Sequence, residues 1–404
     1  MSVETSGSVS YRRLFAVPGF AQLAAGTVLA RTAGQLWQIA LVLFVLQRYH
    51  SPALAGIASF LSLAPGLAIS PIAGALLDRQ GRLRMILLDY AVAAGALVSL
   101  FGLGKWSLLS PPLLLVIVTI SSLTGPLSAS GIRTMFPLVV PRDLWDRANG
   151  IDSGSFALAL VLGPALGGAL VAWIGGEGAF LVTAGIFVVA GAALIGITDP
   201  HVAHVQPSRL LHAAWEGLLY VVRHTTLRGI LLTMLVGNIA YGVLLVALPV
   251  LVLDRFHWGA EVVGEMWAVA GVTTVAAGLL AGRMRTAGRE RWFIAVGMGL
   301  GGVACAVLLF AGSAPWLVVA MLLLGISSGP VDIGIFALRQ RRTDPRWFGR
   351  AFAVSMSLNF AGVPLGSALG GGLVERSMPL ALGIAILVSL VACVVPFVAI
   401  PRHG

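Results

Sequence analysis

The sequence predicts an all-α polytopic membrane protein with twelve transmembrane helices in two six-helix bundles and with both termini in the cytosol. Three observations support this fold class: the composition, the spacing of the apolar runs and the placement of the arginines. Of the 404 residues, 58% are hydrophobic and 10% are charged, and the mean hydropathy is +0.95. Soluble domains carry roughly a quarter charged residues, so this composition indicates a chain that lies in a bilayer.

The apolar runs are each close to the length of about 20 residues that crosses the hydrocarbon core as a helix. They fall at 20–46, 52–77, 85–104, 112–138, 149–173, 178–198, 229–253, 259–281, 292–311, 315–338, 348–373 and 378–400. A more polar stretch interrupts the series. The predicted organisation is therefore an N-terminal bundle (1–198), a cytosolic linker (199–227) and a C-terminal bundle (228–404).

The arginines give the orientation. When the spans are threaded alternately, most of the 26 basic residues fall on one side, and four fall on the other: Arg48, Lys105, Arg255 and Arg376. Arg31 and Arg133 lie within spans. The positive-inside rule places the arginine-rich side in the cytosol. The formal charge of +10 does not indicate nucleic-acid binding, because the arginines occupy short loops and do not form one basic face.

The linker carries an amphipathic pattern. Apolar residues between Leu210 and Val222 fall on one helical face, which predicts a helix lying on the membrane surface. His201 and His204 precede it, but two loop histidines without further ligands favour solvated side chains over a metal site. We expect no metal and no cofactor.

An internal duplication supports the two-bundle prediction. At an offset of 203 residues, Gly163 matches Gly366, and Gly167-Gly168 matches Gly370-Gly371. Spans one and seven align at an offset of 207.

The link between the second and third spans is short, charged and rich in glycine. It reads Gly74-Ala-Leu-Leu-Asp78-Arg79-Gln-Gly81-Arg82-Leu-Arg84. The glycines favour close helix approach and a tight turn, and the acid beside three arginines suits a contact between moving parts. We predict a gating role for this link together with Arg133 and Asp152.

This link resembles the loop signature of the major facilitator superfamily, found between its second and third helices. The fifth span, with Gly150, Gly163-Pro164 and Gly167-Gly168, resembles the signature associated with antiporters of that superfamily, except that Ala159 replaces a glycine. The stretches 140–150 and 214–224 resemble twelve-helix exporters such as macrolide and tetracycline efflux pumps and siderophore exporters. The resemblance implies a secondary transporter with a substrate site near the midplane between its halves. It also implies that Asp89 and Asp152 pair with Arg133 and the Asp78 loop, as in the cytosolic charge network of that superfamily.

Polar residues within the spans are candidates for the substrate cavity, because charge at membrane depth is costly. Arg31 shares a helical face with Gln35 and Gln38, and the offset of 207 places Asn238 opposite Arg31, with Tyr241 one turn later. Asn359 completes the predicted set. For Arg31 the alternative is a structural cation that pairs with a neighbouring acid or carbonyl groups.

Proton coupling needs a carboxylate that changes its protonation as the cavity changes sides. The candidates are Asp332, Glu265 and Asp89, with Asp332 preferred because it lies deepest in its span.

These features predict a proton-coupled exporter of a small amphiphilic compound, with protons, the substrate and the lipid bilayer as partners. The alternative is a proton symporter that imports a polar or anionic metabolite. An enzyme would need clustered His, Asp or Ser groups at one depth, and the sequence shows no such cluster. We expect a monomer in the plasma (inner) membrane. Lys105 is the only lysine among the basic residues, which suggests a GC-rich bacterial genome.

Overall fold

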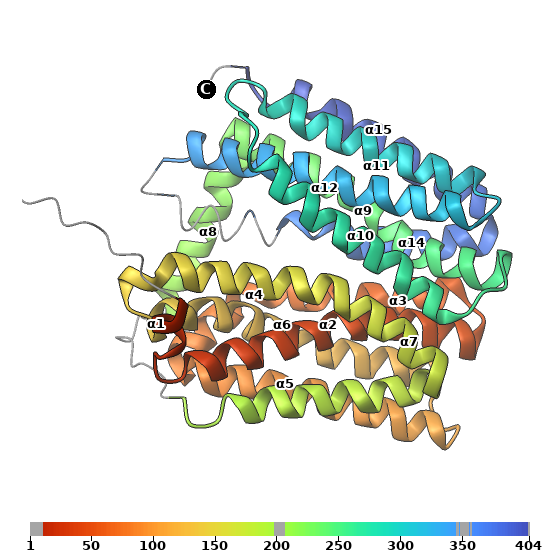
Figure 1. Ribbon diagram of the computed structural model, residues 1–404, viewed down its shortest axis with the longest axis horizontal. Helices are drawn as coiled ribbons and strands as arrows, with labels where there is room; N and C mark the ends of the chain where they lie inside the picture. Colours follow the sequence, from red (N-terminus) through yellow and green to blue (C-terminus); the bar gives the residue numbers. More distant parts are fainter. Residues whose placement is uncertain (1–10, 198–206, 345–346, 348–354, 356–357, 403–404) are drawn as a thin grey trace, which may run out of the picture.

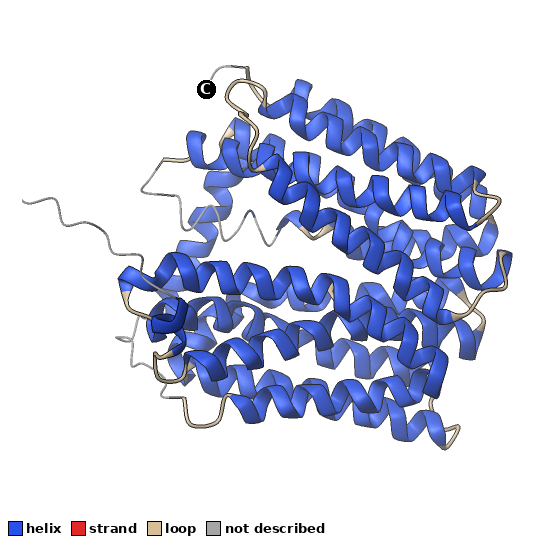
Figure 2. Cartoon of the chain, viewed as in Figure 1, coloured by secondary structure: helices blue, strands red, loops and turns tan. Residues whose placement is uncertain are grey.

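A computed structural model describes residues 11–197, 207–344, 347, 355 and 358–402. Within these residues the regular structure is helical and contains no strand (Figure 2). The predicted all-α fold class is therefore confirmed.

The N-terminal half follows the predicted spans closely. The second span is the exception, because it is divided into two helices at Ser62 and Leu63, just before Pro65. Proline lacks a backbone N–H and fits the first turn of a helix, so it starts a new helix here. The elements of this half are α1 (Tyr11–Phe15), α2 (Phe20–Tyr49), α3 (Pro52–Leu61), α4 (Ala64–Gln80), α5 (Arg82–Lys105), α6 (Pro111–Val139), the 3-10 turn Arg142–Leu144 and α7 (Trp145–Ala193).

Helix α7 contains two predicted spans. At Gly175 the backbone adopts φ 75° and ψ 170°, which is not helical, and an L side chain rarely adopts this φ. The chain turns back at this glycine, so the two parts of α7 run in opposite directions (Figure 1).

The C-terminal half has a similar order of helices. Its elements are α9 (Thr225–Val250), the π-helical turn Leu251–Arg255, α10 (Ala260–Ala281), α11 (Glu290–Phe310), α12 (Ala314–Arg342), α14 (Gly362–Arg376) and α15 (Met378–Ala399). Much of the predicted span 348–373 lies outside the described residues. Ten helices in the described part of the chain are long and apolar enough to cross a membrane, with the two parts of α7 counted together.

The helices form two bundles, α1–α7 and α9–α15 (Figure 1). We call the end at which α4 meets α5 and α10 meets α11 the arginine-rich end, and the opposite end the arginine-poor end. The arginine-rich end carries Arg79, Arg82, Arg84, Arg283, Arg285 and Arg289.

The bundles contact each other through glycines near the arginine-poor end. A Cβ atom added to Gly168 of α7 would lie 2.8 Å from Gly264 Cα of α10, and one added to Gly371 of α14 would lie 2.9 Å from Gly56 Cα of α3. Gly168 and Gly371 are also a matched pair of the predicted duplication. Nearer the arginine-rich end, a Cβ atom at Gly154 of α7 would meet nothing within 4 Å. The described bundles therefore meet at the arginine-poor end and diverge toward the arginine-rich end (Figure 1).

The linker helix α8 (Pro207–Arg223) lies at the arginine-rich end between the two bundles (Figure 1). Tyr220 of α8 stacks on Trp347 with ring centroids 5.0 Å apart, and Val221 is buried. Trp215 is 58% exposed. Val222, which like Trp215 belongs to the predicted apolar face, is 43% exposed. The amphipathic helix on the membrane surface stays a prediction. His201 and His204 lie outside the described residues.

Candidate substrate and coupling site

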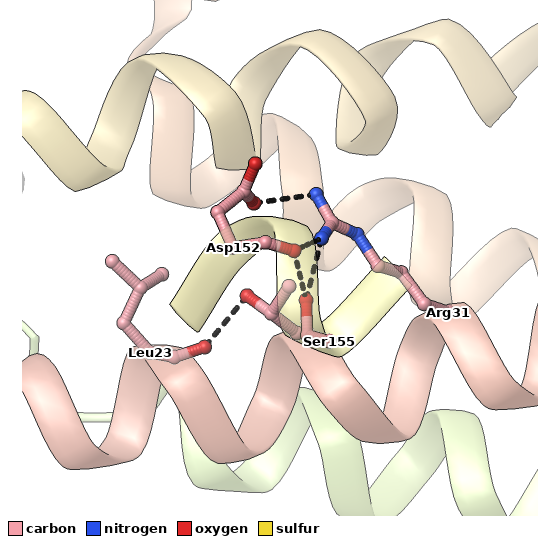
Figure 3. Close-up of polar contacts among 5 residues, drawn as sticks. Leu23, Arg31, Asp152 and Ser155 are labelled. Atoms are coloured by element: carbon pink, nitrogen blue, oxygen red, sulfur yellow. Dashed lines mark hydrogen bonds and ion pairs between the residues drawn. The ribbon is translucent and has the colours of Figure 1, made fainter. Parts of the chain in front are cut away.

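An ion pair joins α2 to the first part of α7. Arg31 donates from Nη2 to Asp152 Oδ1 at 2.6 Å, and from Nη1 to the Asp152 carbonyl at 2.6 Å and to Ser155 Oγ at 2.5 Å (Figure 3). The Ser155 hydroxyl donates in turn to the Asp152 carbonyl at 2.7 Å. The exposed fraction is 15% for the Arg31 side chain and 24% for the Asp152 side chain. The pair is thus reachable without being at the surface.

The depth of this pair explains why Arg31 has so many partners. Arg31 lies about 16 Å along α2 from the arginine-rich end, at roughly 1.5 Å per residue. An unpaired charge at such a depth is costly, and Asp152 neutralises it. The guanidinium carbon also lies 6.0 Å from the centre of the Phe156 ring, a distance at which a cation is attracted to an aromatic face. A cation, an anion and an aromatic ring therefore lie together.

The partner of Asp152 differs from the predicted one. The sequence suggested that Asp152 pairs with Arg133, whereas the structure pairs it with Arg31, and Arg133 is exposed on α6. The predicted alternative for Arg31, a cation held by a neighbouring acid, describes the observed geometry. Arg31 and Asp152 both keep part of their side-chain surface exposed.

The other polar residues of α2 point to two different neighbours. Gln35 packs against Gly163 of α7. Gln38 directs its Nε2 toward Ser62 Oγ at the end of α3, at a distance of 3.4 Å. The predicted face therefore divides between α7 and α3.

The C-terminal half has a neutral counterpart of the ion pair. Asn238 of α9, at the position predicted to match Arg31, donates from Nδ2 to the Asn359 carbonyl at 2.7 Å. Asn359 is buried, and its Oδ1 has no hydrogen-bond partner among the described residues. Tyr241 lies edge-on to Trp267 of α10, with ring centroids 5.4 Å apart. The two halves thus present an ionic contact on one side and amide and aromatic groups on the other.

Asp332 of α12 has an exposed side chain and a charged neighbour on the same helical face. Arg339, two turns later, interacts electrostatically with Asp332 and is 2% exposed. On the adjoining face of α12, Val331, Ile335 and Leu338 belong to one buried cluster with Leu227 and Ile230 of α9 and Ile294 of α11. Glycines at 325 and 329 pack on α10. Asp332 therefore lies on the side of α12 between its α9 and α10 neighbours.

The other two carboxylates predicted for proton coupling have different surroundings. Glu265 is exposed and shares its face of α10 with Val272 and Leu279, which are 55% and 70% exposed. This apolar face suits contact with lipid, and Glu265 is close enough to the start of α10 to reach the arginine-poor surface. Asp89 is 5% exposed and lies beside the hydroxyls of Ser128 and Thr124 on α6. Its predicted partner Arg133 is exposed.

The signature loop forms a tight turn between α4 and α5. Gly81 has φ 92°, a conformation that favours glycine. Arg82 donates from Nε to Thr134 Oγ1 of α6 at 3.1 Å, and Arg79 is exposed. Asp78 belongs to the last turn of α4, but its side chain lies outside the described part of the structure. A Cβ atom added at Gly74 would meet nothing within 4 Å.

The glycines of the antiporter-like helix are contact points. Gly163 packs on Gln35 of α2, Gly167 lies against the Leu36 carbonyl, and Gly168 reaches α10 of the other bundle. Pro164 lies inside α7, and Gly150 lies near the Tyr11 hydroxyl. This helix therefore touches both α2 and the opposite bundle.

Comparison with known families agrees with this architecture. The family model of the Major Facilitator Superfamily matches residues 23–286 and 230–404. The chain belongs to the major facilitator superfamily. It is accordingly a transporter and not an enzyme, and its apolar spans and bacterial relatives place it in the bacterial inner membrane as a multi-pass protein.

Relatives of this major facilitator include named exporters. An uncharacterised MFS-type transporter, y4rN of Sinorhizobium fredii, is 37% identical over 96% of both chains. The multidrug efflux pump Tap of Mycobacterium tuberculosis is 29% identical over 87% of this chain and 86% of its own length. The enterobactin exporter EntS of Citrobacter koseri is 28% identical over 85% of this chain and 79% of its own length.

Solved structures share the fold of this major facilitator at low sequence identity. The nucleoside transporter NupG superposes with a TM-score of 0.74 at 12% identity, over 94% of this chain and 97% of its own. A bacterial homologue of the iron transporter ferroportin superposes with a TM-score of 0.71 at 16% identity, over 95% of this chain and 98% of its own.

The contacts of some charged residues of this major facilitator were not predicted from the sequence. Arg339 was assigned to the arginine-rich loops, whereas it is buried in α12. Arg339 follows Asp332 by seven residues, or two helical turns, and this spacing predicts that both side chains lie on the same face of α12. Glu177 pairs with Arg48 at 2.8 Å, and Glu375 contacts the opposite bundle; both lie at span ends, where a charge needs no partner.

Proposed function

We propose that this major facilitator exports a small amphiphilic compound from the cytosol in exchange for protons. The observation that carries the proposal is the similarity to Tap and EntS, named a multidrug efflux pump and an enterobactin exporter, over 87% and 85% of this chain. The glycine- and proline-containing face of α7 gives independent support, because it resembles the signature associated with antiporters.

The proposed substrate cavity lies between Arg31 and its partners on one side and α9 and α12 on the other. Measured along their helices at about 1.5 Å per residue, Arg31, Asn238 and Asp332 lie roughly 15–20 Å from the arginine-rich end. Phe156 and the Tyr241–Trp267 pair supply aromatic surface near the charged and amide groups. Aromatic rings beside one ion pair suit a molecule with an apolar body and a polar or charged group. Gln35, Gln38 and Asn359 complete the proposed lining.

We propose Asp332 as the carboxylate that carries the proton. It is exposed in the structure, so a proton can reach it when the proposed cavity opens. Arg339 lies on the same face and can compensate the ionised form. Glu265 and Asp89 are weaker candidates, because the first lies on an apolar outer face and the second is buried beside hydroxyl groups.

In this proposal the chain crosses the membrane twelve times, acts as a monomer and keeps both termini in the cytosol. The arginine-rich end then faces the cytosol, as the positive-inside rule requires. The loop with Gly74, Asp78, Arg79, Gly81 and Arg82 acts with Arg133 in the exchange between conformations. Asp78→Asn is expected to slow transport with little change in apparent substrate affinity.

The alternative is a proton symporter that imports a polar or anionic metabolite. Its support is the Arg31 guanidinium, which suits an anion, and the presence of a nucleoside transporter among proteins of the same fold. The fold does not distinguish the two directions.

Transport by everted membrane vesicles tests the direction. Vesicles with the arginine-rich end outward and an acidic interior should accumulate a fluorescent amphiphile such as ethidium, and a protonophore should abolish the accumulation. Vesicles that carry Asp332→Asn serve as the control with intact insertion. Gradient-driven uptake into right-side-out vesicles alone would support the importer. Growth inhibition across a panel of antibiotics and siderophores then narrows the substrate class.

A further inference from the structure

A carboxylate of the C-terminal bundle contacts the first turn of a helix in the N-terminal bundle. Glu375 Oε2, at the end of α14, accepts from the Ala53 N–H at 2.9 Å and from Ser51 Oγ at 3.3 Å. Ser51 is the N-cap residue of α3, and its Oγ accepts from the Leu54 N–H at 3.1 Å. The start of α3 is therefore capped partly by its own bundle and partly by the opposite one.

The chemistry of a helix start explains why a carboxylate binds there. The first N–H groups of a helix have no partner within it, and the helix dipole adds partial positive charge. Because Pro52 has no N–H, the first free donor of α3 belongs to Ala53. An ionised Glu375 satisfies this donor with a charge-assisted hydrogen bond.

The contact lies at the edge of the glycine interface between the bundles. Glu375 follows Gly371 by about one helical turn, and Ala53 precedes Gly56 by about one turn, so the capping contact lies on the arginine-poor side of the Gly56–Gly371 contact. The separation of α3 from α14 cannot occur without losing it.

The matching interface between α7 and α10 is built differently. At the offset of 203, the position of Glu375 corresponds to Ala172 of α7, whose side chain is a methyl group and cannot accept a hydrogen bond. The start of α10 instead carries Glu261, whose carboxylate folds back beside its own N-cap residue Gly259. Of the two related helix starts, α3 is therefore capped across the interface, whereas no side-chain capping hydrogen bond is described at Gly259 of α10.

We propose that Glu375 is a positioning residue of the transport cycle: it holds α3 and α14 together at the arginine-poor end, and this contact must break before the substrate site opens to that side. The inference rests on the proposed function, in that a transporter opens its substrate site alternately to the two sides of the membrane, but it does not depend on the direction of transport or on the coupling ion. Removal of the carboxylate should raise the population that is open at the arginine-poor end.

The labelling rate of a buried cysteine in the interface measures this population. Ser367 of α14 is 0% exposed, and its backbone packs against Gly56 of α3. Ser367→Cys, in a chain with Cys305→Ser and Cys393→Ser, can react with a hydrophilic maleimide only when α3 and α14 separate. The measurement uses the full chain in nanodiscs and needs neither substrate nor a proton gradient, so a failed transport assay does not affect it.

Variants of Glu375 and a control carboxylate distinguish the effect of losing the Glu375 carboxylate from a general effect of mutation on labelling. Glu375→Ala should increase the labelling rate of the reporter about two- to tenfold. This fold-change corresponds to the stabilisation expected from an exposed charge-assisted hydrogen bond and from a negative charge at a helix start. Glu375→Gln should give a smaller increase, because an amide oxygen still accepts. Glu177→Gln is the matched control: this carboxylate also lies at the arginine-poor end, but it pairs with Arg48 inside one bundle, so the rate should stay unchanged.

A second reporter detects loss of packing. Ser389 is buried between α15 and α11, where its Cβ lies near Gly302. Ser389→Cys in the same background should keep its labelling rate in every Glu375 variant. An unchanged Ser367→Cys rate in Glu375→Ala would overturn the proposal, and so would an equal increase at both reporters, because that would indicate general loosening.

Discussion

Arg31 of α2 and Asp152 of α7, separated by 121 residues in the chain, form an ion pair with an N–O distance of 2.6 Å in the interior of the N-terminal bundle. The pair retains partial exposure, and Ser155 and Phe156 lie beside it. Arg31 is thus held by an acid and remains available to a substrate. Any substrate that binds Arg31 also meets the charge of Asp152.

A double-mutant cycle separates the structural and substrate roles of Arg31. Arg31→Gln or Asp152→Asn alone should lower the free energy of unfolding by about 1–3 kcal/mol, because each leaves its partner uncompensated at membrane depth. The double variant should recover a large part of this loss in thermal unfolding of detergent-solubilised protein.

Transport by the same double variant provides the second readout. If Arg31 contacts substrate, the double variant should be stable yet remain at least about tenfold slower than the parent, since one charged hydrogen bond contributes roughly 1.5–3 kcal/mol. Full recovery of both stability and transport would assign the pair to structure alone.

Neutralising Asp332 should uncouple transport from the proton gradient. Asp332→Asn removes the titrating group but keeps its size, so gradient-driven uptake into everted vesicles should fall to background while counterflow of substrate persists. Glu265→Gln is the matched control, because Glu265 is a carboxylate on the exposed apolar face of α10, and its transport should stay near the parental rate. Normal gradient-driven transport by Asp332→Asn would remove Asp332 from the coupling mechanism.

The contact between α7 and α10 predicts that a glycine-to-alanine substitution affects transport at Gly168 but not at Gly154. The Cβ atom of Gly168→Ala would lie 2.6 Å from the Ala260 carbonyl, whereas that of Gly154→Ala would meet nothing within 4 Å. Gly168→Ala should push the bundles apart at the arginine-poor end and reduce the transport rate several-fold. Gly154→Ala should transport like the parent and gain slightly in helix propensity. Equal rates for the two variants would show that this close approach is dispensable.

Thiol labelling tests the orientation. Gln80 and Leu108 are both exposed, the first at the arginine-rich end and the second at the arginine-poor end. In a background without Cys305 and Cys393, an impermeant maleimide applied to intact cells should label Leu108→Cys and leave Gln80→Cys unlabelled. Everted vesicles should give the reverse. Labelling of Gln80→Cys in intact cells would show that the arginine-rich end faces outward, opposite to the proposed orientation.

The spans and the identity of several contact residues were predictable from the sequence. The predicted span 259–281 corresponds to α10 at Ala260–Ala281, and the duplicated glycines at 163 and 168 recur in the contacts of 366 and 371. Such features depend on local composition and on repetition along one chain. The break at Gly175, where α7 turns back, was likewise bracketed by the two predicted spans.

The partners of the charged residues were not predictable in the same way. The sequence suggested Arg133 as the partner of Asp152, whereas the structure pairs Asp152 with Arg31. The choice depends on how α2, α6 and α7 cross. Arg339 was assigned to the arginine-rich side because it follows the predicted span 315–338, yet α12 continues to Arg342 and Arg339 is buried.

By itself the sequence determined that this chain is a bundle of membrane-spanning helices and which end carries the arginines, because the bilayer selects apolar length and loop charge locally. Only the tertiary structure decided that Arg31 pairs with Asp152, that Glu375 reaches α3 of the other bundle, and that the bundles meet at one end. These relationships depend on distances of a few ångströms between helices far apart in the chain, and such distances are set by side-chain packing throughout both bundles.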